Sequence, residues 1–213
     1  CLFLLLAACA GHSNIITYHL AFNVTDGERQ KELLLASLRV VERRLDAIGE
    51  KLLDKEFIIG EGDGGLKLTL SDPLVGDVLT SQLQSPFSID FLRQALPSES
   101  PDITVEGHGG FMKTGIDGTH VNWVQAQQDA TPEKGRVTMT FTPEGHTLLS
   151  TFFHDQKGKD IGLFVRGRLV SKLTIKDELK DAIEIRDIPS LLLAQVFADD
   201  VNVGLHVMFT VQP

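Results

Sequence analysis

Hydrophobic and polar residues alternate with two different periods along the first 50 residues. Residues 15–22 form a short run rich in β-branched and aromatic side chains, which predicts a strand. Asp26 then offers an N-cap, and Gly49 ends the pattern that follows. Between them, apolar residues recur at steps of four and three, which places them on one face of a helix: Leu34, Leu38, Val41, Leu45 and Ile48.

The next segments predict the rest of a small sheet domain. Residues 57–59 and 66–70 are typical of a hairpin, because their apolar positions lie on either side of a glycine-rich turn. Residues 75–84 carry a weak helical pattern, and residues 87–91 alternate as a strand. The order strand, helix, hairpin, helix, strand is βαββαβ, so we expect a ferredoxin-like base.

A second region follows a loop that is rich in proline, glycine and serine, at residues 96–110. Two strands are expected at 121–127 and 137–141, and Thr142-Pro143 then starts a helix. A hairpin is expected at residues 161–175 and a strand, which also fits a helical step, at 183–185. A helix is expected at 189–198 and a final strand at 203–211. We expect an α/β head with a mixed or antiparallel sheet and two helices, and hence an α+β protein.

The N-terminal residues predict a membrane attachment. The two cysteines of the chain are Cys1 and Cys9, so the folded part has no thiols for a disulfide or a zinc site. Residues 2–8 are apolar, as in a signal peptide, and residues 6–9 (LAAC) resemble the lipobox of bacterial lipoproteins. We expect a lipid on Cys9, with an ordinary cleaved signal peptide as the alternative. Because the chain begins at Cys1 rather than at methionine, we expect its true start to be missing.

These patterns define the expected domain organisation. A signal peptide with a truncated start occupies residues 1–8, the ferredoxin-like base residues 9–95, the linker loop 96–110 and the head 111–213.

Composition narrows the class of partner. Of the 213 residues, 42% are hydrophobic and 23% are charged, as is usual for a globular protein. The formal net charge is -9, and phosphate-backbone binding usually requires a basic face. We therefore expect no nucleic acid partner.

Four segments, in this order along the chain, resemble the first periplasmic domain of SecD, the protein-export membrane subunit. They are residues 40–49 (VVERRLDAIG), 113–115 (KTG), 137–145 (VTMTFTPEG) and 158–171 (GKDIGLFVRGRLVS). The resemblance covers the chain from about residue 30 to its end. It implies a ferredoxin-type base followed by a head that binds a translocating polypeptide on the far side of the membrane.

The sequence also departs from the SecD pattern. The family's Gly-Leu-Asp-Leu-x-Gly-Gly element is absent, Lys172 and Leu173 replace the usual Ala-Pro, and Arg186-Asp187 stands where glycine is common. The proton relay of the family lies in the six transmembrane helices that follow this domain, so none of its carboxylates is carried over to this chain.

No motif in the sequence supports catalysis. The Lys113-Thr114-Gly115 triplet occurs without the Ser-x-x-Lys of penicillin-binding enzymes, and Met112 replaces the glycine of a phosphate loop. Asp177-Glu178 and Asp199-Asp200 are expected to be loop or surface charges. The histidines lack metal-ligand spacing and stand at His12, His19, His108, His120, His146, His154 and His206. We expect no enzyme, no metal and no cofactor.

Two features of the head suggest how a polypeptide is bound. Trp123 is the only tryptophan; it is either a contact for a partner on an exposed strand face or a core residue. An exposed edge of the head sheet offers backbone groups to an added peptide strand, which would bind many sequences.

The sequence therefore predicts an extracytoplasmic binding module, held on a bacterial membrane by lipidated Cys9, that assists protein translocation. Its expected partners are translocating or unfolded polypeptide and Sec translocon components. The alternative is an envelope lipoprotein of the same fold with an unrelated assembly or ligand-binding role.

Overall fold

The protein has two compact units, each with its own sheet structure. The computed structural model describes residues 14–60 and 63–212, so Cys9 and the expected signal peptide lie outside the described residues. This part contains four α-helices and three antiparallel sheets and is α+β, as the sequence predicts. One unit comprises the described residues up to Ser85 together with those from Met208 onward, and the other is Pro86–Val207.

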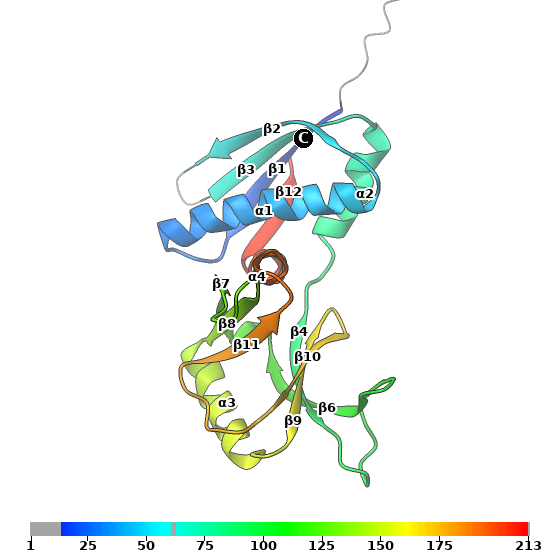
Figure 1. Ribbon diagram of the computed structural model, residues 1–213. Helices are drawn as coiled ribbons and strands as arrows, with labels where there is room; N and C mark the ends of the chain where they lie inside the picture. The colour runs from blue at the N-terminus through cyan, green and yellow to red at the C-terminus, as the bar shows by residue number, and fades with distance from the viewer. Residues whose placement is uncertain (1–13, 61–62, 213) are drawn as a thin grey trace, which may run out of the picture. The chain divides into compact units, whose positions relative to one another are not determined.

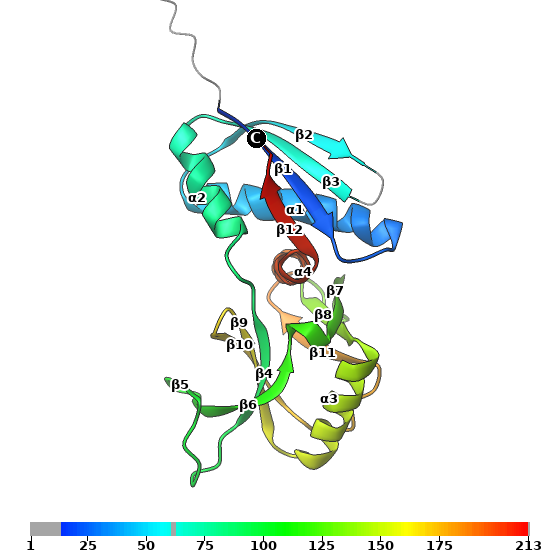
Figure 2. The ribbon, with the colours of Figure 1, turned by 180° about the vertical axis from the view of Figure 1, so that it is seen from behind.

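The first unit is a four-stranded sheet with two helices packed on one face (Figure 1). Figure 2 shows the sheet from its opposite face, in front of α1. The strand order is β12, β1, β3, β2. The bounds are β1 Asn14–Phe22, α1 Gly27–Ala47, β2 Leu52–Ile59, β3 Asp63–Leu70, α2 Pro73–Leu83 and β12 Val207–Val211.

Helix α1 begins and ends where the sequence predicts. The Asp26 side chain accepts a hydrogen bond of 2.8 Å from the Arg29 amide, which satisfies one of the free N–H groups of the first turn. Gly49 follows the helix with a φ of 77°, a conformation that glycine adopts without strain. Between these ends, Leu33, Val41 and Leu45 are buried.

Tyr18 joins three elements in the core of the first unit. Its ring meets the ring of Phe209 on β12 edge to face, with the centroids 5.9 Å apart. Its hydroxyl forms a 2.7 Å hydrogen bond with the hydroxyl of Thr80 on α2. Burial is the main cause that raises the pKa of Tyr18. One side chain thus couples β1, α2 and β12.

The expectation that residues 87–91 complete the base is wrong. The strand at this place, β4 (Ile89–Gln94), pairs with β6 and β9 in the second unit. The final strand of the first sheet is β12, and just beyond it the amide of Gln212 donates to the Thr17 carbonyl at 2.8 Å. The head is therefore inserted into the base rather than attached after it. An alternating pattern indicates a strand, but it does not indicate which sheet that strand joins.

The second unit contains two sheets. One has five strands in the order β10, β9, β4, β6, β5, and the other has three in the order β11, β8, β7. Both sheets and helices α3 and α4 share one core, which includes Phe91, Ile161, Met139, Leu149 and Ala198. The remaining bounds are β5 Ile103–Val105, β6 Gly109–Asp117, β7 Val121–Gln128, β8 Gly135–Phe141, α3 Pro143–Asp155, β9 Asp160–Val165, β10 Arg168–Thr174, β11 Ala182–Ile188 and α4 Leu191–His206.

The expected linker at 96–110 belongs to the second unit. It contains β5 and the start of β6 rather than a loop alone. The guanidinium of Arg93 binds both carboxylate oxygens of Glu99 at 2.7 Å, and this contact lowers the pKa of Glu99 to about 2. A bidentate ion pair thus fixes a segment whose composition predicts a loop.

Helix α4 is longer than the sequence pattern indicates. The helix predicted to stop at Ala198 continues to His206, and the strand predicted from residue 203 begins only at Val207. Ala194, Ala198 and Val201 are all buried, so the helical period continues into the segment that also alternates. Gly204 permits this packing, because a Cβ there would lie 2.3 Å from the ring of Phe87.

The other expected elements are confirmed. Both hairpins form, Thr142 caps α3 through a 3.1 Å hydrogen bond from the Gly145 amide, and the residues around Ile183 are a strand, β11.

Replacing Phe209 tests the role of the C-terminal strand. Phe209→Ala removes a buried ring that packs on Tyr18 and should lower the free energy of unfolding by about 3 kcal/mol. Met208→Ala, at a neighbouring position with 65% exposure, should change it by no more than about 0.5 kcal/mol. Urea denaturation followed by circular dichroism measures both, and equal effects would contradict the placement of β12 in this sheet.

Candidate functional site

A groove of about 550 Å³ opens in the second unit between its two sheets. Its floor is apolar and includes Phe153 of α3, Ile161 and Leu173 of the five-stranded sheet and Ile183 of the three-stranded sheet. Its rim carries charges of both signs, from Lys176, Asp177, Glu178, Lys180, Asp181, Glu184 and Arg186. An apolar floor with a polar rim suits a ligand that has apolar side chains and a polar backbone.

The segment that links β10 to β11, residues 175–181, borders the groove, and we call it the strap. At its start, Ile175 exchanges backbone hydrogen bonds with Lys159 and Gly158, at 2.9 and 2.7 Å. Near its end, His146 of α3 donates from Nε2 to the Lys180 carbonyl at 2.6 Å. The strap is therefore tied to the body of the second unit near both of its ends.

A second cavity of about 470 Å³ lies along the strap, and we call it the side cavity. Glu178 and Leu179 line it as well as the groove. Its other lining residues belong to α3: Ser150, Thr151 and His154. The middle of the strap thus separates two hollows.

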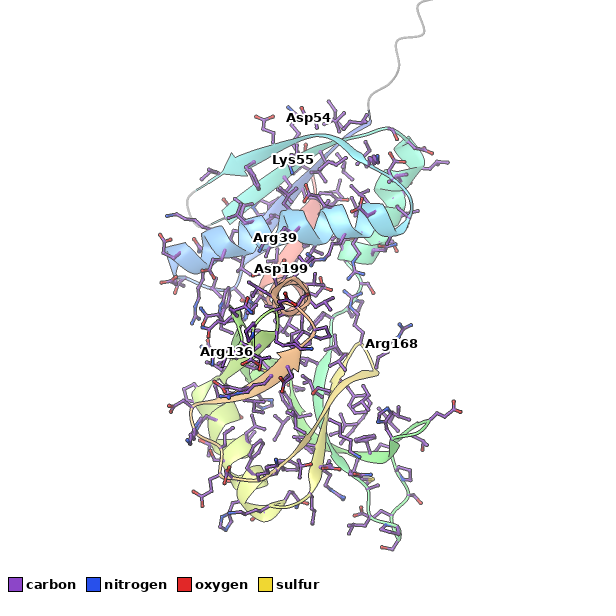
Figure 3. All side chains as sticks on the ribbon, in the orientation of Figure 1. Arg39, Asp54, Lys55, Arg136, Arg168 and Asp199 are labelled. Carbon is purple, nitrogen blue, oxygen red and sulfur yellow. The ribbon has the colours of Figure 1, made fainter. Side chains whose placement is uncertain are left out.

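The strand that precedes the strap, β10, is one of the two terminal strands of the five-stranded sheet. Val170 on this strand is 47% exposed, and Figure 3 shows Arg168 pointing away from the β9–β10 hairpin. Lys172 forms a 3.1 Å ion pair with Asp160, which also accepts a 2.7 Å hydrogen bond from the Thr174 hydroxyl. Both contacts lower the pKa of Asp160, and the hydrogen bond from Thr174 has the larger effect. These side-chain contacts therefore hold β10 against β9.

The strand that follows the strap, β11, is a terminal strand of the three-stranded sheet. Glu184 on this strand binds the guanidinium of Arg186, and this contact raises the pKa of Arg186. Glu184 also lies 3.8 Å from the guanidinium of Arg136. Two terminal strands from different sheets thus lie next to one groove. Terminal strands carry unpaired N–H and C=O groups to which an extended chain can bind.

The other terminal strand of the three-stranded sheet, β7, is closed by α4. The amide of Val124 donates to Oδ1 of Asn202 at 2.9 Å, and Nδ2 of Asn202 donates to the Val124 carbonyl at 2.7 Å. Asn202 is 6% exposed, so this side chain replaces a neighbouring strand in a buried position. An added peptide would have to displace α4 to pair at Val124.

Trp123 lies beside this closed edge. Its half-buried ring stacks on the ring of His206 at the end of α4, with centroids 5.6 Å apart and an angle of 22° between the planes. The structure therefore places Trp123 in the contact between β7 and α4, away from the residues that line the groove. Its role as a partner contact stays a prediction.

Several histidines have structural contacts. His19 forms a 2.7 Å contact with Asp63, and His120 lies 3.1 Å from Asp117 in a capping interaction. Within the described part of the chain, no group of three histidine, cysteine, aspartate or glutamate side chains is positioned to hold a metal ion. His12 lies outside the described residues.

One expectation about charges is wrong and another is confirmed. Asp199, expected in a loop or at the surface, is 2% exposed. The reason is that α4 continues past residue 198 and turns this position inward. The side-chain amide of Gln195 donates a 2.9 Å hydrogen bond to the Asp199 carboxylate. Asp177 and Glu178 are exposed, as expected.

The KTG triplet lies at an irregular point of β6. The Thr114 hydroxyl donates to the Phe91 carbonyl where the register between β4 and β6 shifts, and Gly115 has a φ of 78°. The triplet thus shapes a β-bulge.

Sequence patterns do not single out His146 or Asn202. Their hydrogen bonds reach backbone groups 34 and 78 residues away. Such contacts arise only from the three-dimensional fold, and a single sequence carries no local signal for them.

The fold of the chain resembles solved structures of SecDF. A chain from work on SecDF as a membrane component that enhances protein export has a TM-score of 0.51 and 17% identity, covering 92% of this chain and 98% of that one. SecDF in its super-membrane-facing form has a TM-score of 0.51 and 16% identity, covering 95% of this chain and 30% of the other. These likenesses show the fold. No protein-family model matches the sequence, and no curated protein matches it significantly.

Among residues 14–60 and 63–212, no helix has both the length and the apolar character needed to cross a membrane.

Replacing Asn202 tests how the β7 edge is closed. Asn202→Ala leaves the buried N–H and C=O of Val124 without this partner and should lower the free energy of unfolding by about 2 kcal/mol or more. Hydrogen exchange of the Val124 amide, measured by NMR, should accelerate. Gln125→Ala, at an exposed position of the same strand, is the control and should change stability by less than about 0.5 kcal/mol. An unchanged Val124 exchange rate in Asn202→Ala would contradict this account.

Proposed function

We propose that the protein is an extracytoplasmic binding module that holds unfolded or translocating polypeptide during protein export. The observation that carries the proposal is the fold: both units together resemble SecDF, described as a membrane component that enhances protein export. The groove supports the proposal by supplying a place for a polypeptide in the second unit. The proposal assigns the protein no catalytic step.

The geometry of the groove suggests how such a polypeptide binds. An extended segment pairs through its backbone with the outer edge of β10 and directs alternate side chains toward the apolar floor. Backbone pairing provides affinity without reading a sequence, while the floor favours segments with aliphatic or aromatic residues. A module that assists export must accept many sequences, so this mode suits the proposed task.

The N-terminal sequence supports attachment to a membrane. Lipidation of Cys9 would join the folded part to acyl chains, each of which contributes about 0.8 kcal/mol per buried CH₂. An anchored module would meet polypeptides as they leave the Sec translocon, whose components are its proposed partners.

A second candidate function uses the same fold for an unrelated envelope role. The observation that favours it is the volume of the groove, because about 550 Å³ lies within the range of roughly 300 to 1,000 Å³ that is usual for small-ligand sites. In this case the groove would hold a small molecule in place of a polypeptide segment.

Binding of an unfolded protein separates the two candidates. The full chain should bind reduced, carboxymethylated α-lactalbumin, which is permanently unfolded, in fluorescence anisotropy. Val170→Asp should weaken this binding about tenfold, because it places a charge at an exposed position of β10, the strand with which the polypeptide is proposed to pair. Leu192→Asp is the matched control, since Leu192 is 72% exposed on α4, and it should bind as the wild type does.

A different pair of results would favour the second candidate: the unfolded probe does not bind, and a small ligand raises the melting temperature of the protein. Crosslinking to translocon components in cells would favour the first.

Replacing the lipidation residue tests the proposed anchor. Cys9→Ser removes the thiol that would accept the lipid, so the protein should move from the membrane fraction to the soluble fraction of the cell. Fractionation and immunoblotting measure the distribution. An unchanged membrane fraction in Cys9→Ser would contradict a lipid on this residue.

A further inference from the structure

We infer that the strap is a movable wall between the polypeptide-binding groove and the side cavity, which an incoming polypeptide displaces. This inference rests on the proposed function and adds a regulatory element to the same site. In this arrangement the strap keeps the two hollows apart until a client is present.

Leu179 is the residue that divides the two hollows. It packs against the shared core of the second unit and lines both the groove and the side cavity. Moving it outward would join the two hollows, of about 550 and 470 Å³, into one longer channel.

The strap also shows which polypeptide chemistry fits. Leu179 stands between Glu178 and Lys180, so this wall of the groove presents one aliphatic residue between charges of both signs. Other charges of both signs, including Glu184 and Arg186, line the rim. The structure thus points to client segments in which an isolated aliphatic residue is flanked by charged residues.

The way in which the strap is held makes displacement feasible. Residues 175–181 form neither helix nor strand. Their start is paired with Gly158 and Lys159, which provides a hinge, and His146 ties Lys180 to α3 by a hydrogen bond. Leu179 is half-buried rather than fully enclosed. Ile175 is 2% exposed and stays in the core, so the part that moves is residues 176–181, which are exposed or half-buried. Segments with few buried contacts open at lower free energy than the core.

A single thiol on the strap reports its position. In the full chain with Cys1→Ser and Cys9→Ser, Leu179→Cys supplies the only cysteine. Its alkylation should be slow in the free protein and about tenfold faster when reduced, carboxymethylated α-lactalbumin is bound, because the strap spends more time displaced. Leu192→Cys, at an exposed position of α4, should react rapidly with or without the probe.

Weakening the strap should strengthen binding. Leu179→Ala and His146→Ala each make the closed state less favourable, so the open state is more populated and the affinity for the same probe should rise about threefold or more. Leu148→Ala is the control, because Leu148 is 42% exposed on α3 and does not line either hollow. It should bind the probe as the wild type does.

The outcomes distinguish this inference from the proposed function. Binding with faster labelling of the strap thiol in Leu179→Cys supports both. Binding without a change in labelling overturns the displaced strap and leaves polypeptide binding in place. Binding to Leu179→Ala but not to the wild type supports a strap that keeps the two hollows apart. Failure of both proteins to bind the probe overturns the inference together with the proposed function.

Discussion

Unpaired backbone groups at the ends of its sheets are the constraint on which the organisation of this protein depends. An open sheet leaves a row of N–H and C=O groups on each terminal strand, and these must be covered, kept short or used. Strand β5 has only three residues, β2 carries Asp54, Lys55 and Glu56 at its centre, and β7 is closed by Asn202. The strands β10 and β11 instead border the groove.

This difference between the edges connects the fold to its proposed task. The two sheets of the second unit share a core, and the groove lies where β10, β11 and α3 approach one another. An apolar floor beside a terminal strand offers both backbone pairing and side-chain burial to an extended polypeptide. The same surface is a hazard when empty, because it would also attract other copies of the chain. The strap, with Leu179 between the groove and the side cavity, limits the extent of this surface.

Local patterns predicted the elements better than their partners. Helix α1, the two hairpins and the cap at Thr142 follow from periodicity and capping residues within a few positions. The placement of β12 beside β1 does not, because strand pairing joins residues almost 200 positions apart. The end of α4 was obscured where helical and alternating periods coincide. For the site, the alternation of β10 and β11 was visible in sequence, whereas the bonds of His146 and Asn202 depend on distant backbone groups.

Hydrogen–deuterium exchange of the full chain, with and without a saturating unfolded polypeptide, tests the central claim most directly. Backbone amides of β10 should exchange more slowly in the complex, because a bound strand would pair with this edge. Those of residues 176–181 should exchange faster as the strap is displaced from the side of the groove. Protection confined to another surface, or slower exchange of both β10 and the strap, would contradict a groove that is bounded by its own strap and widened by a client.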